Sequence, residues 1–195
     1  EAFRTFVERE MVPHREKWEQ EGIVDRDIFA KAGASGFLAM SVPEQYGGAN
    51  MGYLAHMVAM EEISRASASV GLSYGAHSNL CVNQINRNGT PEQKAKYLPK
   101  LISGEHVGAL AMSEPGAGSD LASLRTRARR DGDHFVVDGQ KVWTSGAHHA
   151  DVLLPDATDL ESLQLWRIGG TKYQEPFWDH QGFALRQPAV AAHGQ

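Results

Sequence analysis

The chain of 195 residues has little cysteine, no excess of basic charge and no long apolar run. Its single cysteine, Cys81, rules out a disulfide within the chain and a metal cluster built on cysteines, and it fits a reducing compartment. The formal net charge of -5 argues against non-specific binding to nucleic acid. No apolar stretch approaches the roughly 20 residues that a membrane-spanning helix needs, so we expect no membrane span.

The N-terminus lacks the pattern of a signal peptide, and the chain begins at Glu1 without a methionine. We therefore expect this first residue to be an internal or trimmed boundary. Internal repeats and low-complexity runs are absent as well. With 42% hydrophobic and 22% charged residues, the composition is that of an ordinary globular protein with a core.

Residues 1 to about 105 carry helical spacing and helix start signals. Asp25 is expected to be the N-cap of a short helix, and a long helix rich in small residues is expected from Val70 to Arg87. The clearest start signal is Thr90, which precedes a proline and is followed at the third position by Gln93. This arrangement is typical of a capping box.

The pattern changes to that of β-strands after residue 106. Four short strands are expected: Val107–Met112, Leu124–Arg130, Phe135–Val137 and Gln140–Thr144. Asp131-Gly132 and Asp138-Gly139 are turn signals between them. The fold class is therefore α+β, in which an all-helical domain precedes the start of an antiparallel β-domain. We expect the following parts: a helical domain over 1–105, a partial β-domain over 106–154 and a tail over 155–195.

The stretch Ala111–Asp120 (AMSEPGAGSD) joins the end of an expected strand to a loop of small and hydroxylated residues. Gly116 and Gly118 allow the backbone to bend sharply and to approach a ligand closely. Ser113 and Ser119 add hydroxyl groups that can bond to such a ligand. A strand that ends in a loop of this kind is a place to bind a cofactor, although many glycine loops are plain turns.

Together with a second stretch, Lys141–Ala147 (KVWTSGA), this loop resembles the signatures of the acyl-CoA dehydrogenase family, A-M-[ST]-E-P-x-A-G-S-D and K-x-W-[IT]-[ST]-[NG]-[GA]. The resemblance covers about residues 2–154. Ser73–Cys81 is most similar to isovaleryl-CoA dehydrogenases, whereas the opening of the chain, with Pro13-His14, looks more like long-chain acyl-CoA dehydrogenases. The two stretches disagree, so the acyl chain preference stays open.

The resemblance implies an FAD site in which one loop runs along the cofactor and the other completes it. The implied contacts are Leu110, Ala111, Met112, Ser113, Gly118, Ser119, Trp143, Thr144 and Ser145. Ser119 would also face the thioester arm of the acyl-CoA substrate. An indole packs on a flat ring, and hydroxyls with backbone amides satisfy a polar edge. The alternative for Trp143 is a tryptophan in the core of a β-hairpin.

The family's reaction is the α,β-dehydrogenation of an acyl-CoA, in which a glutamate removes a proton and the electrons pass to an electron-transferring flavoprotein. That glutamate and the contacts of the homo-oligomer lie in a C-terminal four-helix bundle, and the pattern of residues 155–195 predicts no such bundle. Glu161 and Glu175 in the tail are interpreted as exposed carboxylates, so no catalytic residue is assigned. An acyl-CoA oxidase, or a truncated remnant that binds flavin or acyl-CoA without turnover, remains as an alternative. Bacterial cytoplasm and mitochondrial matrix both fit the family.

Several other polar residues have a structural interpretation. Glu114 is expected to hold its loop through hydrogen bonds to backbone amides. His77 is interpreted as a packed residue, and His148 and His149 as surface residues without the spacing of metal ligands. A group of arginines could contact CoA phosphates, but a solvated strand face is the commoner explanation: Arg125, Arg127, Arg129 and Arg130.

Overall fold

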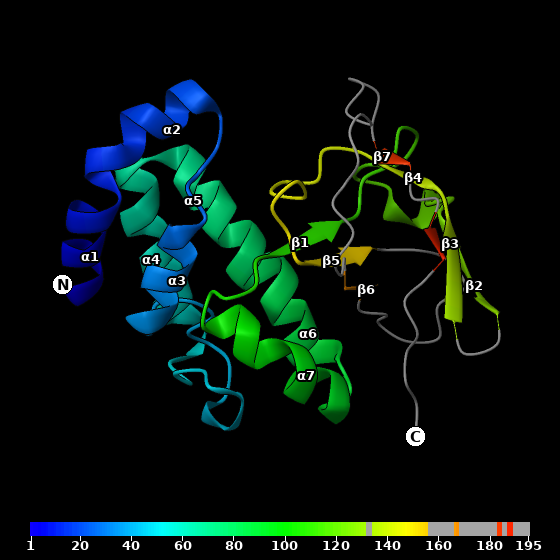
Figure 1. Ribbon diagram of the computed structural model, residues 1–195, viewed down its shortest axis with the longest axis horizontal. Coiled ribbons are helices and arrows are strands. Elements are labelled where there is room, and N and C mark those ends of the chain that lie inside the picture. The colour runs from blue at the N-terminus through cyan, green and yellow to red at the C-terminus, as the bar shows by residue number, and fades with distance from the viewer. Residues whose placement is uncertain (132–133, 156–165, 168–182, 185–186, 189–195) are drawn as a thin grey trace. The chain divides into compact units, whose positions relative to one another are not determined.

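The computed structural model describes residues 1–131, 134–155, 166–167, 183–184 and 187–188. The chain divides into two compact units, 1–108 and 109–195. The first unit is helical and the second is built from short strands (Figure 1). The expected α+β class, with a helical domain followed by antiparallel strands, is confirmed. No helix among the described residues is both long and apolar enough to cross a membrane.

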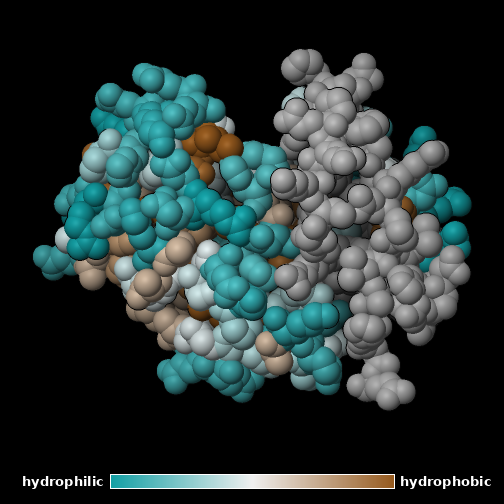
Figure 2. Space-filling model, viewed as in Figure 1, coloured by the Kyte–Doolittle hydropathy of each residue, from teal (hydrophilic) through white to brown (hydrophobic). Residues whose placement is uncertain are grey.

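The first unit consists of α-helices joined by short loops, together with one π-helix, η3 (Ala76–Asn83), and two short 3-10 helices, η1 (Val12–His14) and η2 (Glu44–Tyr46). Its elements are α1 (Ala2–Glu10), η1 (Val12–His14), α2 (Arg15–Glu21), α3 (Asp27–Ala34), η2 (Glu44–Tyr46), α4 (Gly52–Ala66), α5 (Ala68–Gly75), η3 (Ala76–Asn83), α6 (Gln84–Asn88) and α7 (Pro91–Ile102). Most of the viewed face of this unit is hydrophilic, with small apolar areas between the polar side chains (Figure 2).

Helix α7 begins with the expected capping box. Thr90 Oγ1 accepts from the Gln93 backbone N–H at 3.2 Å, and Gln93 Oε1 accepts from the Thr90 backbone N–H at 2.9 Å. The two bonds satisfy donors that a helix end otherwise leaves without partners. The start of this helix is therefore fixed by residues that are adjacent in sequence.

The predicted cap of α3 is wrong. Asp25 does not cap this helix, whose N-cap is Arg26 and which lacks a side-chain cap bond. The Asp25 carboxylate instead accepts from Lys17 Nζ at 3.0 Å. An ammonium group is a stronger partner for a carboxylate than a single backbone amide, and Lys17 comes from a different helix, so the local pattern gave no sign of it.

The long helix predicted from Val70 to Arg87 is present, but it is interrupted in the middle. Helical structure runs from Ala68 to Asn88 through α5, η3 and α6, and its central part, Ala76–Asn83, is a π-helix. This segment contains His77, whose imidazole is fully buried. A wider turn at this point changes which residues face inward, and hydrophobic periodicity does not reveal it.

An aromatic cluster lies in the core of the helical unit. The rings of Phe3 and Phe37 meet edge to face with centroids 4.8 Å apart, and Phe6 contacts Phe37 at 5.3 Å. Tyr74 donates its hydroxyl to the Phe37 carbonyl oxygen at 2.6 Å. Such pairs favour one packing arrangement beyond the area that they bury.

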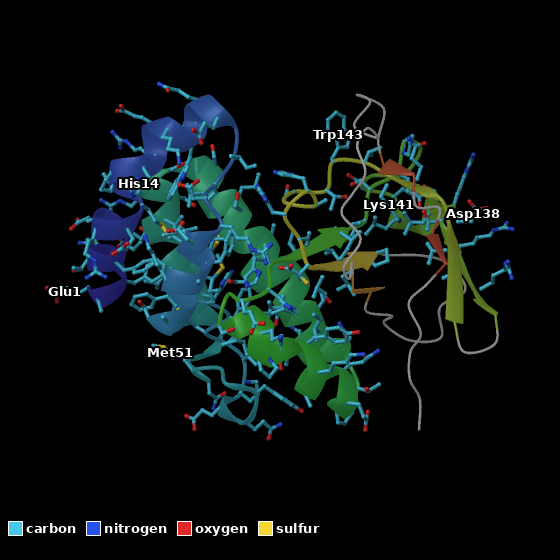
Figure 3. The ribbon with its side chains drawn as sticks, in the orientation of Figure 1. Glu1, His14, Met51, Asp138, Lys141 and Trp143 are labelled. Carbon is cyan, nitrogen blue, oxygen red and sulfur yellow. The ribbon has the colours of Figure 1, made fainter. Side chains whose placement is uncertain are left out.

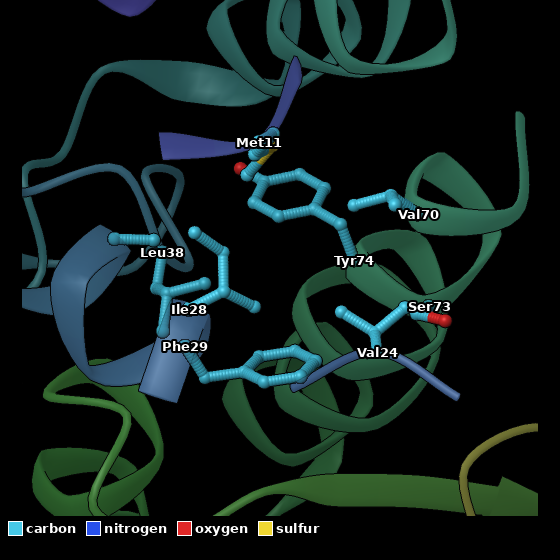
Figure 4. A pocket seen from close by; sticks show the side chains of 9 residues that line it. Met11, Val24, Ile28, Phe29, Leu38, Val70, Ser73 and Tyr74 are labelled. Atoms are coloured by element: carbon cyan, nitrogen blue, oxygen red, sulfur yellow. The ribbon is translucent and has the colours of Figure 1, made fainter. Parts of the chain in front are cut away.

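A small hollow beside this cluster has an almost entirely apolar lining (Figure 4). Its walls are formed by Met11, Val24, Ile28, Phe29, Ala32, Leu38, Val70, Ser73 and Tyr74. None of these side chains carries a charge, and the Tyr74 hydroxyl is already bonded to backbone. The hollow is therefore a packing feature of the helical core rather than a site for a polar cofactor.

Helix α4 presents apolar side chains to solvent. The exposed ones are Tyr53, Leu54, Met57 and Val58, and Leu54 is 77% exposed. Leu72 of α5, the helix that packs on α4, is also exposed. Exposed apolar faces of this kind favour association.

The second unit contains short antiparallel ladders. Its elements are β1 (Gly108–Ala111), η4 (Leu121–Ser123), β2 (Arg127–Asp131), β3 (His134–Asp138), β4 (Gln140–Lys141), β5 (Val152–Pro155), β6 (Trp166–Arg167), β7 (Phe183–Ala184) and β8 (Gln187–Pro188). The strand orders are β1-β5-β6, β2-β3-β8 and β4-β7. The hairpin expected between β2 and β3 is present, with Arg127 opposite Asp138 and Asp131 opposite His134.

Three predicted strands are shorter than expected. The strand predicted over Val107–Met112 is β1, Gly108–Ala111, and the other two are shortened for a local reason. The strand predicted from Leu124 begins at Arg127, because the backbone N–H groups of Arg125 and Thr126 donate to the Glu114 carboxylate instead of a ladder. The strand predicted to reach Thr144 ends at Lys141, because Trp143 adopts a φ of 58° that a strand does not allow.

Candidate functional site

The structure brings the two sequence motifs together in the second unit. The Val142 backbone N–H donates to the Ser113 carbonyl oxygen at 2.9 Å. One residue earlier in each motif, Lys141 Nζ donates to the Met112 carbonyl oxygen at 2.9 Å. The loop that follows Met112 and the loop that contains Trp143 are therefore held side by side.

The first loop closes on itself just beyond Ser113. The backbone groups of Glu114 and Ala117 are bonded in both directions, at 2.8 and 3.2 Å, around a tight turn. Gly116 and Gly118 do not have positive φ, and a Cβ at either would meet nothing within 4 Å among the described atoms. The bend therefore does not require glycine, and the space beside both residues is open to a ligand.

A buried ion pair fixes this turn from inside. Glu114 is 8% exposed, and its carboxylate accepts from the backbone N–H groups of Arg125 and Thr126 at 2.7 and 2.9 Å. Lys141 Nζ lies 3.0 Å from Glu114 Oε1, and the lysine side chain is 0% exposed. The interpretation of Glu114 as a residue that holds its loop is confirmed.

The ionised form of Glu114 is strongly favoured. Burial would raise the pKa of this carboxyl, but the bonds from Thr126, Arg125 and Lys141 outweigh it and lower the pKa to about 2. Glu114 is thus a carboxylate at neutral pH. A permanently ionised carboxylate with all these donors suits a structural role better than proton transfer.

Trp143 projects from the second loop (Figure 3). Its residue is 89% exposed and its φ is 58°, in the left-handed region that side chains other than glycine rarely adopt. The alternative of a tryptophan in the hairpin core is therefore wrong. An exposed indole on strained backbone is unfavourable in an isolated chain, and such strain is typical of ligand sites.

Thr144, the next residue, carries a buried hydroxyl whose hydrogen bonding is incomplete. Its Oγ1 atom has no hydrogen-bond partner among the described residues. An unsatisfied buried hydroxyl costs about 1–3 kcal/mol. Together with the exposed indole beside it, this hydroxyl fits a site that a polar and aromatic ligand completes.

The remaining residues of the expected flavin contacts differ in burial. Gly118 and Ser119 are exposed, and an intermediate exposure is shared by Leu110, Met112, Ser113 and Ser145. Ala111 is completely buried in a small core with Ala109, Ala150 and Leu153. Ala111 therefore presents no surface to a cofactor in this structure, and its place among the flavin contacts stays a prediction.

Lys141 is the residue that the sequence did not place at the site. It lies within one of the motifs, but the resemblance implies no role for it. The available signal is the opposite charge of Glu114 in the other motif. A buried lysine nearly always has an anionic partner, so the two motifs could have been paired through these charges.

His77 and His148 follow the structural interpretation, whereas His149, expected at the surface, is half-buried. His77 is completely buried; its Nε2 bonds to the Leu101 carbonyl oxygen, and its Nδ1 accepts from the Gly108 backbone N–H, both at 3.0 Å. His148 is exposed, and its ring centroid lies 4.3 Å from that of His149. The described residues contain no group of three or more histidine, cysteine, aspartate or glutamate side chains able to hold a metal ion.

The arginines expected on a solvated strand face are exposed where their side chains are described, at Arg125, Arg127 and Arg129. Glu161 and Glu175, the tail carboxylates, lie outside the described residues.

Comparison with known proteins identifies the chain's relatives. The N-terminal domain of acyl-CoA dehydrogenases matches residues 1–105, and the middle domain matches residues 109–172, which reaches into the segment separated above as a tail. Isovaleryl-CoA dehydrogenase, mitochondrial, of Solanum tuberosum is 53% identical over 156 residues, which are 79% of this chain and 38% of that protein.

Solved structures agree with the sequence relatives. An acyl-CoA dehydrogenase from Geobacillus kaustophilus aligns with a TM-score of 0.79 at 40% identity, over 86% of this chain and 46% of that one. An acyl-CoA dehydrogenase from Bacillus anthracis, complexed with FAD, aligns with a TM-score of 0.74 at 34% identity, over 80% and 27%. The chain thus spans less than half the length of these relatives. Both of its units match, and the chain belongs to the acyl-CoA dehydrogenase family.

Proposed function

We propose that this chain is the helical and flavin-contacting part of an FAD-dependent acyl-CoA dehydrogenase. The reaction is the α,β-dehydrogenation of an acyl-CoA thioester, with electrons passed to an electron-transferring flavoprotein. The observation that carries the proposal is Trp143, an indole 89% exposed on backbone at a φ of 58°, next to a buried hydroxyl without a partner. A ligand with a flat ring and a polar edge would pack on the indole and bond to this hydroxyl.

The residues present fit FAD. The loops that would hold it contribute Leu110, Ala111, Met112, Ser113, Gly118, Ser119, Trp143, Thr144 and Ser145. When bound, the flavin supplies a two-electron acceptor for hydride. The chain's own groups bind the flavin and orient it. The Trp143 indole offers a flat apolar face, and the hydroxyls of Ser113 and Thr144 offer hydrogen bonds to the polar edge of the ring.

Ser119 is the residue proposed to face the thioester arm of the substrate. It is exposed at the end of the first loop, beside the open space next to Gly118. Removal of an α-proton requires a base and a stabilised thioester oxygen. None of the described residues is proposed as that base, since Glu114 is committed to its buried ion pair.

The partners and location follow from the same proposal. The whole protein would act as a homo-oligomer with an electron-transferring flavoprotein as its acceptor. One relative, from Solanum tuberosum, is described as mitochondrial, and another is from the bacterium Geobacillus kaustophilus. Mitochondrial matrix and bacterial cytoplasm are the proposed compartments.

A second candidate is a remnant that binds flavin or acyl-CoA without turnover. The observation in its favour is that none of the described residues is proposed as a catalytic base, since Glu114 is committed to its buried ion pair. A third candidate is an acyl-CoA oxidase, which differs from an acyl-CoA dehydrogenase in using oxygen as the electron acceptor.

Anaerobic spectroscopy separates these functions. The whole purified protein is loaded with FAD, excess cofactor is removed, and a panel of acyl-CoA thioesters is added. An acyl-CoA dehydrogenase is expected to bleach the visible flavin absorbance and to regain it with a flavoprotein acceptor. Rapid recovery with oxygen alone would indicate an oxidase. Retained flavin without bleaching by any thioester would indicate the remnant and would contradict turnover by this chain.

A further inference from the structure

Lys141 is a buried charge with no role among the flavin contacts implied by the sequence. Its side chain is 0% exposed, and its ammonium donates to the Met112 carbonyl oxygen at 2.9 Å and to Glu114 Oε1 at 3.0 Å. Burying an ion pair is costly, and apolar residues of similar volume are often as stable or more stable. The charge therefore points to a role beyond packing.

The Met112–Ser113 peptide group is what the ammonium holds in place. In a trans peptide, the C=O of one residue and the N–H of the next point in opposite directions. Because the Met112 carbonyl faces Lys141, the Ser113 N–H faces away from it. This N–H has no acceptor among the described residues, whereas the Ser113 carbonyl is engaged by the Val142 N–H at 2.9 Å.

Lys141 also changes the strength of this peptide as a donor. A cation bonded to a carbonyl polarises the peptide group and strengthens the N–H at its other end. Glu114 keeps the ammonium in position, because its carboxylate is itself fixed by the backbone N–H groups of Arg125 and Thr126. The Lys141–Glu114 ion pair carries no net charge, so the polarisation is confined to the Met112–Ser113 peptide that the ammonium contacts.

We propose that Lys141 is a positioning residue of the flavin site. It orients and polarises the Met112–Ser113 peptide so that the Ser113 N–H donates a hydrogen bond to an electron-rich atom of bound flavin. This inference rests on the function proposed above, because it assigns a donor to that FAD site. Glu114 acts one step further away, through the position of the ammonium.

Substitution of the lysine tests the proposal. In Lys141→Met the dissociation constant for FAD is expected to rise about tenfold or more, because the bond from the Ser113 N–H to the flavin is no longer assisted by the lysine charge. The visible absorption band of bound FAD is also expected to shift. Lys100→Met is the matched control, since Lys100 forms an exposed ion pair with Glu105 at 2.6 Å in the helical unit. Its FAD affinity and spectrum should equal those of the unmodified chain.

Lys141→Met leaves the buried Glu114 carboxylate without its cation, which can destabilise the fold. A second variant therefore removes both charges. Lys141→Met/Glu114→Gln removes both charges and is expected to fold, with the same weakened affinity and shifted band as the single variant. FAD binding within twofold of the unmodified chain, with an unchanged band, in either folded variant would overturn the role of Lys141.

Hydrogen exchange gives a readout that needs no substitution. The Ser113 amide of the unmodified chain is expected to exchange rapidly without FAD and at least about tenfold more slowly with it. Equal exchange in the presence and absence of bound FAD would refute the donor assignment while leaving the proposed function intact. Failure of the unmodified chain to bind FAD at all would instead contradict the proposed function, and this inference with it.

Discussion

At the scale of single residues, the polar groups in the two motifs divide into those that build the loops and those that are left for a ligand. Glu114 and Lys141 satisfy each other and the backbone around them. The Trp143 residue is exposed, and the Thr144 hydroxyl has no hydrogen-bond partner among the described residues. The division follows from the cost of burying unpaired polar atoms and of exposing a large indole.

The structural role of Glu114 could be predicted from its place in a loop rich in backbone amides. The partner Lys141 was not predicted, because it lies 27 residues further along the chain, no periodicity connects the two, and only their opposite charges suggest the pairing. The orientation of Trp143 was likewise open, since a tryptophan near a turn signal fits a hairpin core as well as a ligand site. Only the three-dimensional arrangement distinguishes these alternatives.

Acid should weaken the second unit through Glu114. Its folded pKa of about 2 lies below the ordinary value of 4.5. The carboxylate therefore contributes stability that is complete above pH 4.5 and is lost as the pH falls towards 2, in total about 3 kcal/mol. Urea unfolding followed between pH 6 and 2 measures this loss.

Glu114→Gln should lower the free energy of unfolding at neutral pH by about 3 kcal/mol, since it removes one partner of a buried ion pair. The remaining slope between pH 4.5 and 2 should be smaller than in the unmodified chain. Equal slopes in the two proteins would show that Glu114 is not the group responsible.

The hydroxyl of Thr144 allows stability and binding to be separated. In Thr144→Val the apo chain should be as stable as the original or more so by about 1 kcal/mol, because an unsatisfied buried hydroxyl is removed. The same change should weaken FAD binding several-fold. Thermal unfolding and FAD titration of the variant measure the two effects.

Ser123→Ala serves as the control for this variant, since Ser123 is exposed and, among the described residues, its hydroxyl bonds only to the Asp120 carbonyl oxygen, at 2.8 Å. It should leave FAD binding unchanged. A Thr144→Val chain that is destabilised while binding FAD normally would show that the hydroxyl has a structural partner and no role toward the cofactor.

At the scale of elements, the sequence succeeded where a structure is specified by neighbouring residues. The capping box at Thr90 and the hairpin of β2 and β3 are local features, and both were predicted. The cap at Asp25 and the end of the strand near Trp143 were not, because an ion pair with Lys17 and an unusual backbone angle override propensity. Element boundaries depend on such competition more than element existence does.

Removal of the Thr90 cap should cost about 1 kcal/mol of stability in the helical unit. Thr90→Ala breaks the bond from the Gln93 N–H, which is 3.2 Å long. Thr5→Ala is the matched control, because Thr5 is exposed within α1 and its hydroxyl bonds only to the Glu1 carbonyl oxygen. Equal midpoints of chemical denaturation for the two variants would show that the capping box does not stabilise α7.

The π-helix η3 places His77 where burial favours the neutral imidazole. Burial lowers its pKa to about 4, although the bond to the Leu101 carbonyl opposes this shift. Unfolded histidine takes up a proton near pH 6.5, so the helical unit should lose stability as the pH falls from 6.5 towards 4.

Nuclear magnetic resonance of the imidazole tests this directly. The ring should carry its proton on Nε2 at neutral pH, since Nδ1 accepts from the Gly108 N–H, and it should titrate near pH 4. Titration near the ordinary value of 6.5 would show that the ring is solvated in solution.

At the scale of the whole molecule, family membership and the order of the two units could be predicted from the motifs alone. The exposure of the apolar face of α4 could not be predicted, because the same sequence pattern is equally typical of a helix face buried in the core. Helical periodicity identifies which residues share a face, but the packing of neighbouring elements decides whether that face is covered.

This face should make the chain associate as its concentration rises. Leu54→Glu/Met57→Glu places charges at positions that are 77% and 49% exposed, so the fold should retain its stability while light scattering shows smaller particles. Unchanged particle size in the double variant would show that α4 is not the surface through which copies associate.

The most direct test of the proposed cofactor site is the visible absorption of the purified chain after incubation with FAD and gel filtration. The unmodified chain is expected to retain flavin absorbance, and Trp143→Ala, in which an 89% exposed side chain is removed without disturbing the core, is expected to lose most of it. A folded chain that retains no flavin, or a Trp143→Ala variant that retains as much as the original, would contradict the site described here.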